Sequence, residues 1–158
     1  MTAQPARSFY HLCICVSDLD RSLRFYCDAL GFTRNETFQI GNEVSRLTGI
    51  DGEIALTSVY LGLSGVRLEL WAFAQPAALA RPRQPMNMIG LTHFAIRVDD
   101  IDRALEAVAR HGGTCLPETR TRCTTDGFES DIVYVLDPDG VRVELLWMPE
   151  HMQLALTR

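Results

Sequence analysis

"HLCICVSDLDRSL" at residues 11–23 decides the fold, because "HFAIRVDDIDRAL" at residues 93–105 repeats it without a gap. The two segments share a histidine, a valine, two aspartates, an arginine and a leucine at matching positions. A second pair of segments, "VRLELW" at 66–71 and "VRVELLW" at 141–147, repeats a glutamate among apolar residues. Self-similarity of this kind indicates a duplicated structural unit.

Each copy predicts a βαβββ module. A strand leads into an Asp-rich helix cap, and three further strands follow the glycine that ends the helix. The modules span 8–75 and 90–148 and together form one domain, joined by a proline-rich linker at 74–90. The predicted strands are 9–16, 34–40, 54–63 and 65–73 in the first module and 92–98, 114–119, 130–137 and 140–147 in the second, and the predicted helices are 18–30 and 100–111.

The alternation of side chains along a strand assigns the repeated polar residues to one face. In the first strand of each module, apolar side chains face the helix, so His11 and His93 face the other way. In the last strand of each module, Glu69 and Glu144 likewise oppose the leucines and valines that alternate with them. If the sheets curve toward each other, all four polar side chains line one cavity.

Two imidazoles and two carboxylates that converge in a cavity are ligands suited to a divalent metal such as nickel, zinc, cobalt, manganese or iron. A buried, unpaired carboxylate costs several kcal/mol, and a cation offsets that cost. The sequence therefore predicts a metal ion held by His11, Glu69, His93 and Glu144.

Composition excludes several other classes of protein. The 158 residues are 47% hydrophobic, which suits one compact domain, and the net charge of −5 comes without a basic stripe for nucleic acid. No apolar run approaches the roughly 20 residues of a membrane span. The five cysteines show no CxxC spacing and are expected to be free thiols in a reducing cytoplasm, so we expect a cytoplasmic location.

These segments resemble the vicinal oxygen chelate superfamily, which includes glyoxalase I, extradiol dioxygenases and bleomycin- and fosfomycin-resistance proteins. The resemblance covers residues 8–148 and rests on the repeated segments together with "YVLDPDGVRVELLW" at 134–147. It implies an α+β fold of two tandem βαβββ modules that form a cupped mixed sheet with helices on its outer face. It also implies the ligand set His11, Glu69, His93 and Glu144, and a homodimer in which modules pair within the chain or across the dimer.

The branches of the superfamily differ in how well they match. Glyoxalase I uses the same four ligand types, but its glutathione contacts correspond here to Cys15 and Phe73, which favours a less charged substrate. The extradiol branch resembles this chain from Val133 to Glu144, and Tyr134 matches its active-site tyrosine, although the signature histidine near 125–127 is absent. The resemblance therefore favours a glyoxalase-I-like lyase or isomerase acting on a small, mostly apolar oxygenated substrate. A ring-cleaving Fe(II) dioxygenase and a non-catalytic small-molecule binder are the alternatives.

The resemblance also implies roles for individual residues. The metal acts as a Lewis acid on the substrate's oxygens, and Glu69 or Glu144 could act as general base, with Tyr134 as a further catalytic residue. The remaining candidates lie on strands: two arginines that could anchor an anionic group or be solvated strand-edge charges, and two aromatic residues that could line the substrate pocket or the core. These are Arg97 and Arg142, and Trp71 and Phe73.

Overall fold

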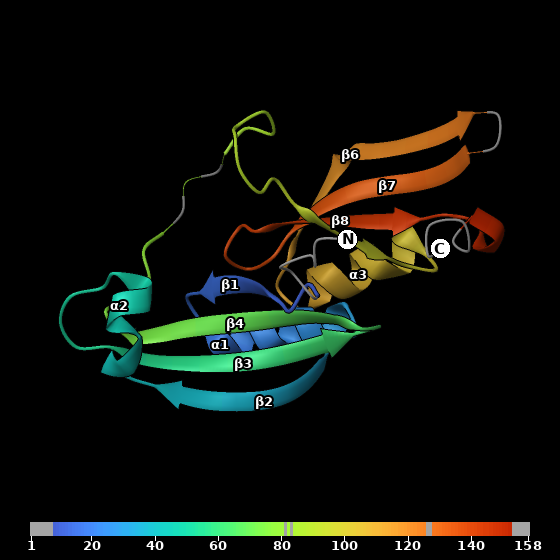
Figure 1. The fold of residues 1–158 in the computed structure, drawn as a ribbon. Coiled ribbons are helices and arrows are strands. Elements are labelled where there is room, and N and C mark those ends of the chain that lie inside the picture. The colour runs from blue at the N-terminus through green and yellow to red at the C-terminus, as the bar shows by residue number, and fades with distance from the viewer. Residues whose placement is uncertain (1–7, 81, 83, 126–127, 153–158) are drawn as a thin grey trace, which may run out of the picture. The chain divides into compact units, whose positions relative to one another are not determined.

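The computed structural model describes residues 8–80, 82, 84–125 and 128–152 of the chain. Its first sheet contains β1 (Leu12–Val16), β2 (Thr33–Ile40), β3 (Ala55–Leu63) and β4 (Val66–Gln75) in the order β1-β4-β3-β2, as Figure 1 shows. Strands β1 and β4 are parallel, and the remaining pairs are antiparallel. The mixed sheet follows from the predicted βαβββ order, because the helical crossover returns the chain parallel to β1.

The second sheet repeats this topology. It contains β5 (Phe94–Arg97), β6 (Thr114–Thr125), β7 (Phe128–Leu136) and β8 (Arg142–Trp147) in the order β5-β8-β7-β6. Strands β5 and β8 are again the parallel pair. The predicted α+β class with two tandem mixed-sheet modules is therefore confirmed.

Two local features differ from the sequence prediction. Strands β6 and β7 extend toward each other beyond the predicted ends at 119 and 130, because a threonine-rich polar segment pairs as a long hairpin instead of forming a loop. Between β2 and β3 the chain also forms the short helices η2 (Asn42–Val44) and α2 (Ser45–Thr48), which end at Gly49 with φ of 66°. Gly49 takes the left-handed conformation that favours glycine at a helix end.

Burial confirms the predicted faces of the strands. Ile14 and Val16 of β1 are buried while the cysteines between and beside them are exposed. In β4, Leu68 and Leu70 are almost fully buried and form the apolar face. Val143 fills the same place in β8. The apolar stripe of each sheet therefore lies opposite the repeated histidines and glutamates.

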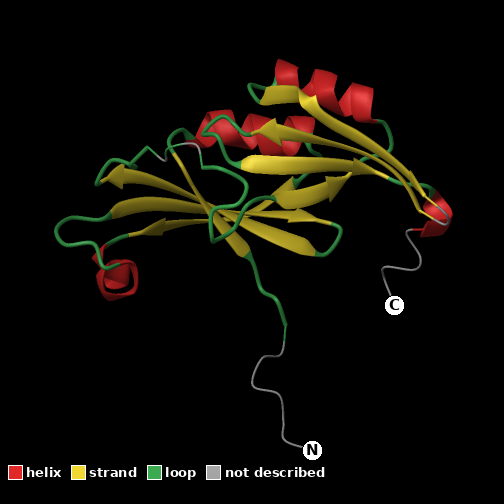
Figure 2. Cartoon of the chain, turned by 90° about the horizontal axis from the view of Figure 1, so that it is seen from above, coloured by secondary structure: helices red, strands yellow, loops and turns green. Residues whose placement is uncertain are grey.

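The helices of the two copies differ. In the second copy α3 (Ile101–Arg110) is a regular helix, and the Asp100 side chain accepts a hydrogen bond from the N–H of Arg103 at its start. In the first copy the predicted helix 18–30 consists of a short α1 (Leu19–Leu23) continued by the π-helical η1 (Arg24–Ala29), seen in red in Figure 2. The wider turn of a π-helix changes which side chains face inward along this segment.

The chain forms two compact units, and most of the first copy's helix belongs to the unit that contains the second copy. Of the described residues, one unit contains those within 8–19 and 32–79, and the other contains those within 20–31 and 80–152. Within the second unit, Phe25 lies fully buried against Gly113, where an added Cβ would come within 2.5 Å of the Phe25 ring. The first copy's helix therefore packs as part of the unit that holds the second copy's sheet.

A buried polar contact fixes the helix in this unit. The Tyr26 hydroxyl donates to Oδ2 of Asp137 at 2.8 Å, and the other carboxylate oxygen accepts the N–H groups of Asp139 and Val141 at 2.9 and 2.7 Å. Arg21 also binds Asp139 at 2.8 Å. Burial raises the pKa of Asp137, while these three donors act in the opposite direction. The "DPDG" turn is therefore both a tight turn and the anchor of η1.

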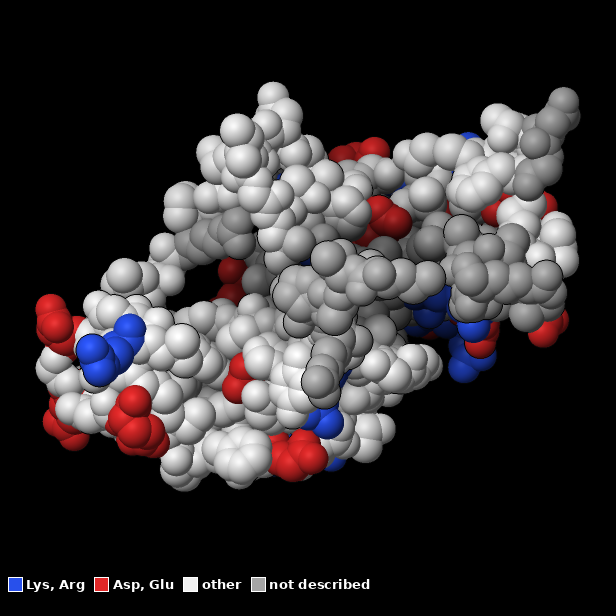
Figure 3. All heavy atoms as spheres, viewed as in Figure 1, with Lys and Arg blue, Asp and Glu red and all other residues white. Residues whose placement is uncertain are grey.

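Charges of both signs are interspersed on the surface. Figure 3 shows acidic and arginine side chains together at the end of the first unit that carries α2, where Glu43, Arg46, Asp51 and Glu53 are exposed. No helix in the described part of the chain is long and apolar enough to cross a membrane.

We expect Tyr26→Phe to lower the free energy of unfolding by about 1–3 kcal/mol, because a buried carboxylate loses a donor. The loss should shrink in acid, since protonated Asp137 depends less on that donor, whereas above the raised pKa of Asp137 the full loss applies. Urea denaturation at neutral and acidic pH measures both effects. Thr57→Val, which removes an exposed hydroxyl bonded to Gln39, is the control and should change stability by less than about 0.5 kcal/mol. Equal losses in the two variants would contradict the anchoring role.

Candidate metal site

A first half-site is formed by His11, Tyr60 and Glu69. Nε2 of His11 lies 3.0 Å from Oε2 of Glu69, and Oε1 of Glu69 accepts a hydrogen bond of 2.6 Å from the Ser58 hydroxyl. Glu69 is buried, with 5% of its side chain exposed, and Ser58 is fully buried. Both oxygens of the carboxylate are therefore occupied, one by an imidazole and one by a hydroxyl.

The sheet register explains this arrangement. Cys13 of β1 pairs with Glu69 in the parallel ladder, so His11, two residues earlier on the same face, is close enough for its ring to reach the carboxylate. On the other side Glu69 lies directly opposite Tyr60 in the antiparallel ladder of β3 and β4. The ring of Tyr60 meets the ring of His11 edge to face at 5.5 Å between centroids. Glu69 therefore lies between His11 on the β1 side and Tyr60 on the β3 side.

The carboxylate changes the acidity of its neighbours. Desolvation raises the pKa of Cys13 to about 12, with Glu69 as the second cause, although the residue as a whole is exposed. Desolvation and then Glu69 also raise the pKa of Tyr60 above its ordinary value. Both groups are therefore protonated at neutral pH.

A second half-site is formed by His93, Tyr134 and Glu144. Nε2 of His93 lies 3.1 Å from Oε2 of Glu144, and Tyr134 lies directly opposite Glu144 in the ladder of β7 and β8. The rings of His93 and Tyr134 meet edge to face at 5.1 Å. Desolvation and then Glu144 raise the pKa of Tyr134. The duplication has therefore preserved the spatial arrangement of all three residues.

The half-sites differ in what holds each ligand. In the second, Nδ1 of His93 lies 2.9 Å from the Thr92 hydroxyl, whereas the buried Nδ1 of His11 has no hydrogen-bond partner among the described residues. Glu144 has 16% of its side chain exposed, about three times the fraction for Glu69. Ile132 occupies the register position that corresponds to Ser58, so no hydroxyl binds Glu144 from that position. The first half-site fixes its glutamate, and the second fixes its histidine.

The geometry of each pair fits two adjacent ligands of one metal ion. Imidazole nitrogen and carboxylate oxygen bind divalent metals at about 2.0–2.2 Å, so neighbours at a right angle lie about 3.0 Å apart. Among the residues that the structure describes, no group of three or more His, Cys, Asp or Glu has the spacing of a complete site. Binding of one ion by all four predicted ligands remains a prediction.

The structure places the four predicted substrate residues as follows. Trp71 and Phe73 follow Glu69 on the same face of β4, are half-buried, and contact each other edge to face at 6.0 Å. Arg97 lines a shallow hollow of about 350 Å³ with Trp147 and neighbouring residues.

Arg142 has a different environment. Its guanidinium lies 5.9 Å from the Tyr134 ring centroid and donates at 3.4 and 3.3 Å to the carbonyls of Thr92 and Gln84 in the linker. Its donors are therefore engaged with the backbone that leads into β5. The predicted role of Arg142 in substrate binding is untested by these contacts.

Sequence reasoning missed Ser58 and Tyr60, which complete the first half-site. A signal was present for Tyr60: it precedes Glu69 by nine residues, and Tyr134 precedes Glu144 by ten, across the same kind of hairpin. Ser58 gave no signal, because its counterpart is an isoleucine and a buried serine in a strand is ordinary.

Comparisons with known proteins identify the family. Residues 8–145 match the family model described as the glyoxalase/bleomycin resistance protein/dioxygenase superfamily. The uncharacterized protein YaeR of Escherichia coli is 32% identical over 145 residues, which are 88% of this chain and 95% of that protein. The lactoylglutathione lyase of Haemophilus influenzae is 30% identical over 143 residues, which are 86% of this chain and 89% of that enzyme.

Solved structures show the same fold. A glyoxalase family protein from Bacillus cereus superposes with a TM-score of 0.77 at 21% identity, covering 94% of this chain and 98% of that one. The fosfomycin resistance protein FosX from Listeria monocytogenes, solved in complex with Mn(II) and sulfate, superposes with a TM-score of 0.62 at 13% identity, covering 94% and 98%. The duplicated sheets, the repeated His–Glu pairs and the match over 8–145 lead to one conclusion: the chain belongs to the glyoxalase/bleomycin resistance protein/dioxygenase superfamily.

Proposed function

We propose that the protein is a divalent-metal-dependent enzyme that performs a glyoxalase-I-like lyase or isomerase reaction. The observation that carries the proposal is the repeated His–Glu pair, with 3.0 Å between nitrogen and oxygen in one copy and 3.1 Å in the other. The two half-sites share one ion, from within one chain or across a homodimer. The relatives named lactoylglutathione lyase, at about 30% identity, support an enzyme of this superfamily.

The burial of Glu69 is the physical argument for a cation. No arginine forms an ion pair with this carboxylate among the described residues, and its partners are the His11 ring and the neutral side chains of Ser58, Tyr60 and Cys13. A desolvated carboxylate without a cationic partner is costly, and a divalent ion bound by both His11 and Glu69 would remove that cost. The donor set of two nitrogens and two oxygens suits nickel, zinc, cobalt, manganese or iron.

The differences between the half-sites favour different chemical roles for the two glutamates. A bound metal would act as a Lewis acid on the oxygens of the substrate. Glu144 is the better candidate for the general base, because it is more exposed than Glu69 and Ile132 stands at the position from which Ser58 binds Glu69. It would take a proton from the carbon beside a substrate carbonyl and return it to the neighbouring position. Tyr134, directly opposite, would orient this carboxylate.

The substrate is a small, mostly apolar oxygenated compound. Cys15 and Phe73 occupy the positions expected to contact glutathione, and neither offers the charge or amide of such a contact. Trp71 and Phe73 on the glutamate face of β4 supply apolar surface instead. The enzyme would act in the cytoplasm, where its five free cysteines stay reduced.

Metal titration tests whether one ion serves both half-sites. In protein labelled with ¹³C at the tyrosine Cζ, we expect the signals of Tyr60 and Tyr134 to shift together and to saturate at one zinc per chain, because each faces a ligating glutamate. Tyr60→Phe and Tyr134→Phe assign the two signals, and buried Tyr26 is the internal control. Saturation at two equivalents, or a shift of one signal alone, would refute the shared ion.

Substitution of each glutamate separates binding from catalysis. We expect Glu144→Gln to retain metal but to lower kcat by about 10²–10⁴-fold, because a general base is removed. Glu69→Gln should lose most of the metal. Elemental analysis and turnover of phenylglyoxal with 2-mercaptoethanol or glutathione as thiol measure both effects. Turnover of a catechol with ring cleavage would favour the dioxygenase instead, and absence of metal from the purified wild type would favour a binding protein.

Substitution of Ser58 tests the fixed ligand. We expect Ser58→Ala to weaken metal binding by about 10–100-fold, because the hydrogen bond that orients Glu69 is lost. Competition with a chromogenic chelator measures the affinity. Ser130→Ala is a matched control, since Ser130 is equally buried and its hydroxyl has no partner among the described residues. An unchanged affinity in Ser58→Ala would show that the hydrogen bond does not orient a ligand.

A further inference from the structure

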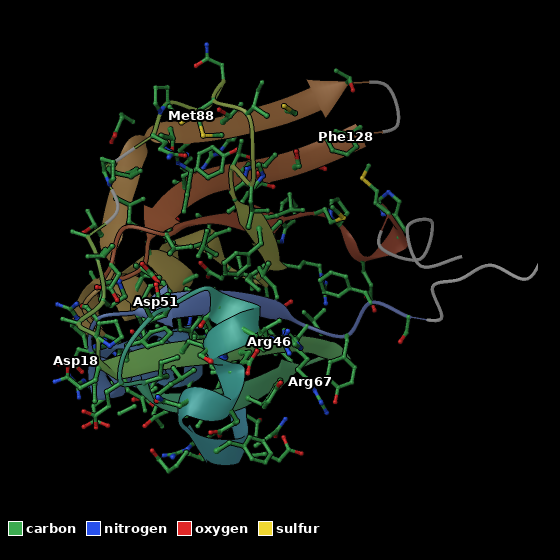
Figure 4. All side chains as sticks on the ribbon, turned by 60° about the vertical axis from the view of Figure 1, so that its left-hand side comes forward. Asp18, Arg46, Asp51, Arg67, Met88 and Phe128 are labelled. Carbon is green, nitrogen blue, oxygen red and sulfur yellow. The ribbon has the colours of Figure 1, made fainter. Side chains whose placement is uncertain are left out.

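Arg67 is an arginine that the function above does not use, although it lies beside the first half-site. It precedes Glu69 by two residues on β4, so both side chains lie on the same face of the strand. At a rise of 3.3–3.4 Å per residue, their Cα atoms are about 7 Å apart. In Figure 4 its side chain extends from the start of β4 at one end of the first sheet.

Aromatic rings hold the guanidinium in place. Its Cζ lies 5.0 Å from the ring centroid of Tyr10 and 5.3 Å from that of Tyr60, and Nη1 donates to the Tyr10 hydroxyl at 3.0 Å. Contacts of this kind to two rings restrict a side chain that would otherwise lose much rotamer entropy on binding. The guanidinium is therefore preorganised and half-buried.

The positive charge of Arg67 has no carboxylate partner among the described residues, in contrast to several other arginines. Arg21 pairs with Asp139, and Arg120 and Arg122 both pair with Asp131. Arg67 has only a neutral hydroxyl as acceptor, so most of its five N–H donors remain available. A planar guanidinium with free donors binds a carboxylate in bidentate geometry.

The second copy shows that this arrangement is not a by-product of the repeat. Arg142 corresponds to Arg67 and also lies over a tyrosine, Tyr134, but its donors reach backbone carbonyls of the linker. Arg67 makes no such contact with a described residue, and Tyr10 supplies a second ring there instead. Within the part of the chain that the structure describes, Arg67 alone combines contacts to two aromatic rings with unused donors.

We infer that Arg67, held between Tyr10 and Tyr60, is an anion subsite that binds a terminal carboxylate of the substrate. The inference rests on the proposed function and narrows its substrate class. The ligand is a small compound with two vicinal oxygens at one end and a carboxylate at the other, separated by the roughly 7 Å between positions 67 and 69. Its middle is apolar, in keeping with the neighbouring aromatic side chains.

Two 2-oxo acids of similar length test the subsite. 2-Oxoglutarate carries a terminal carboxylate, and 2-oxohexanoate ends in a methyl group, while both present the same vicinal oxygens. In calorimetric titrations of the full-length, metal-loaded protein we expect 2-oxoglutarate to bind at least tenfold more tightly. Equal affinities, or undetectable binding of 2-oxoglutarate, would overturn the inference.

Variants connect the preference to the guanidinium. Arg67→Met keeps an apolar stem between the rings and should abolish the preference by weakening 2-oxoglutarate binding alone. Arg67→Lys keeps the positive charge without the planar guanidinium and should retain only part of the preference for 2-oxoglutarate. Arg34→Met removes an exposed arginine of the same sheet whose side chain donates to Thr37, and should leave the preference intact. A preference that persists in Arg67→Met would overturn the subsite.

Removal of the metal distinguishes this inference from the proposed function. Stripping the metal should weaken both 2-oxo acids to the same extent, because they share the chelating end. The Arg67 substitutions act only on the terminal carboxylate. If stripping changes neither affinity, the metal-dependent function fails while the effect of Arg67→Met still decides the subsite.

Discussion

The burial of a carboxylate against an imidazole is the constraint on which the site depends. Glu69 lies on the face of β4 opposite two buried leucines, and the adjoining strands supply His11 on one side and Tyr60 on the other. A strand position of this kind has no water to solvate a charge, so the partners must be fixed by the register itself. Any slip of one residue would turn the glutamate into the apolar face. The parallel pairing of the first and last strands of each module is therefore as much a requirement of the chemistry as of the fold.

Duplication explains why so much of the fold could be predicted. Two copies of one pattern allow each uncertain element to be checked against its counterpart, and period-two alternation then assigns the faces. The elements that could not be predicted lack a counterpart or depend on tertiary contacts. Helices η2 and α2 occur in the longer loop of the first copy alone. The packing of η1 in the second unit depends on the fit of Phe25 against Gly113 and on the hydrogen bond from Tyr26 to Asp137, which no local pattern reveals.

The residues of the candidate site also separate into those that the sequence indicates and those that it does not. The repeat marks His11, His93, Glu69 and Glu144 in the sequence, and the structure forms both His–Glu pairs, while their role as metal ligands stays a prediction. Tyr60 was recoverable from its spacing to Glu69. Ser58 could not be predicted, because its counterpart in the second copy is an isoleucine. The contact of Arg67 with Tyr10 could not be predicted either, because no motif marks a tyrosine near the start of the described chain. Residues that orient a ligand through hydrogen bonds or ring contacts are identified from the structure and not from the sequence.

The two copies have diverged in the residues around the predicted ligands, and the proposed single active site would require such a divergence. A symmetric pair of half-sites would bind a metal but would treat both ends of a substrate alike. Here Ser58 fixes one glutamate, while Ile132 leaves the other without such a bond. Most N–H donors of Arg67 are unused among the described residues, whereas Arg142 donates to backbone carbonyls of the linker segment. Under the proposed function, these differences would give the substrate a direction, because Glu144 is the more exposed carboxylate in one half-site and Arg67 lies beside the other half-site.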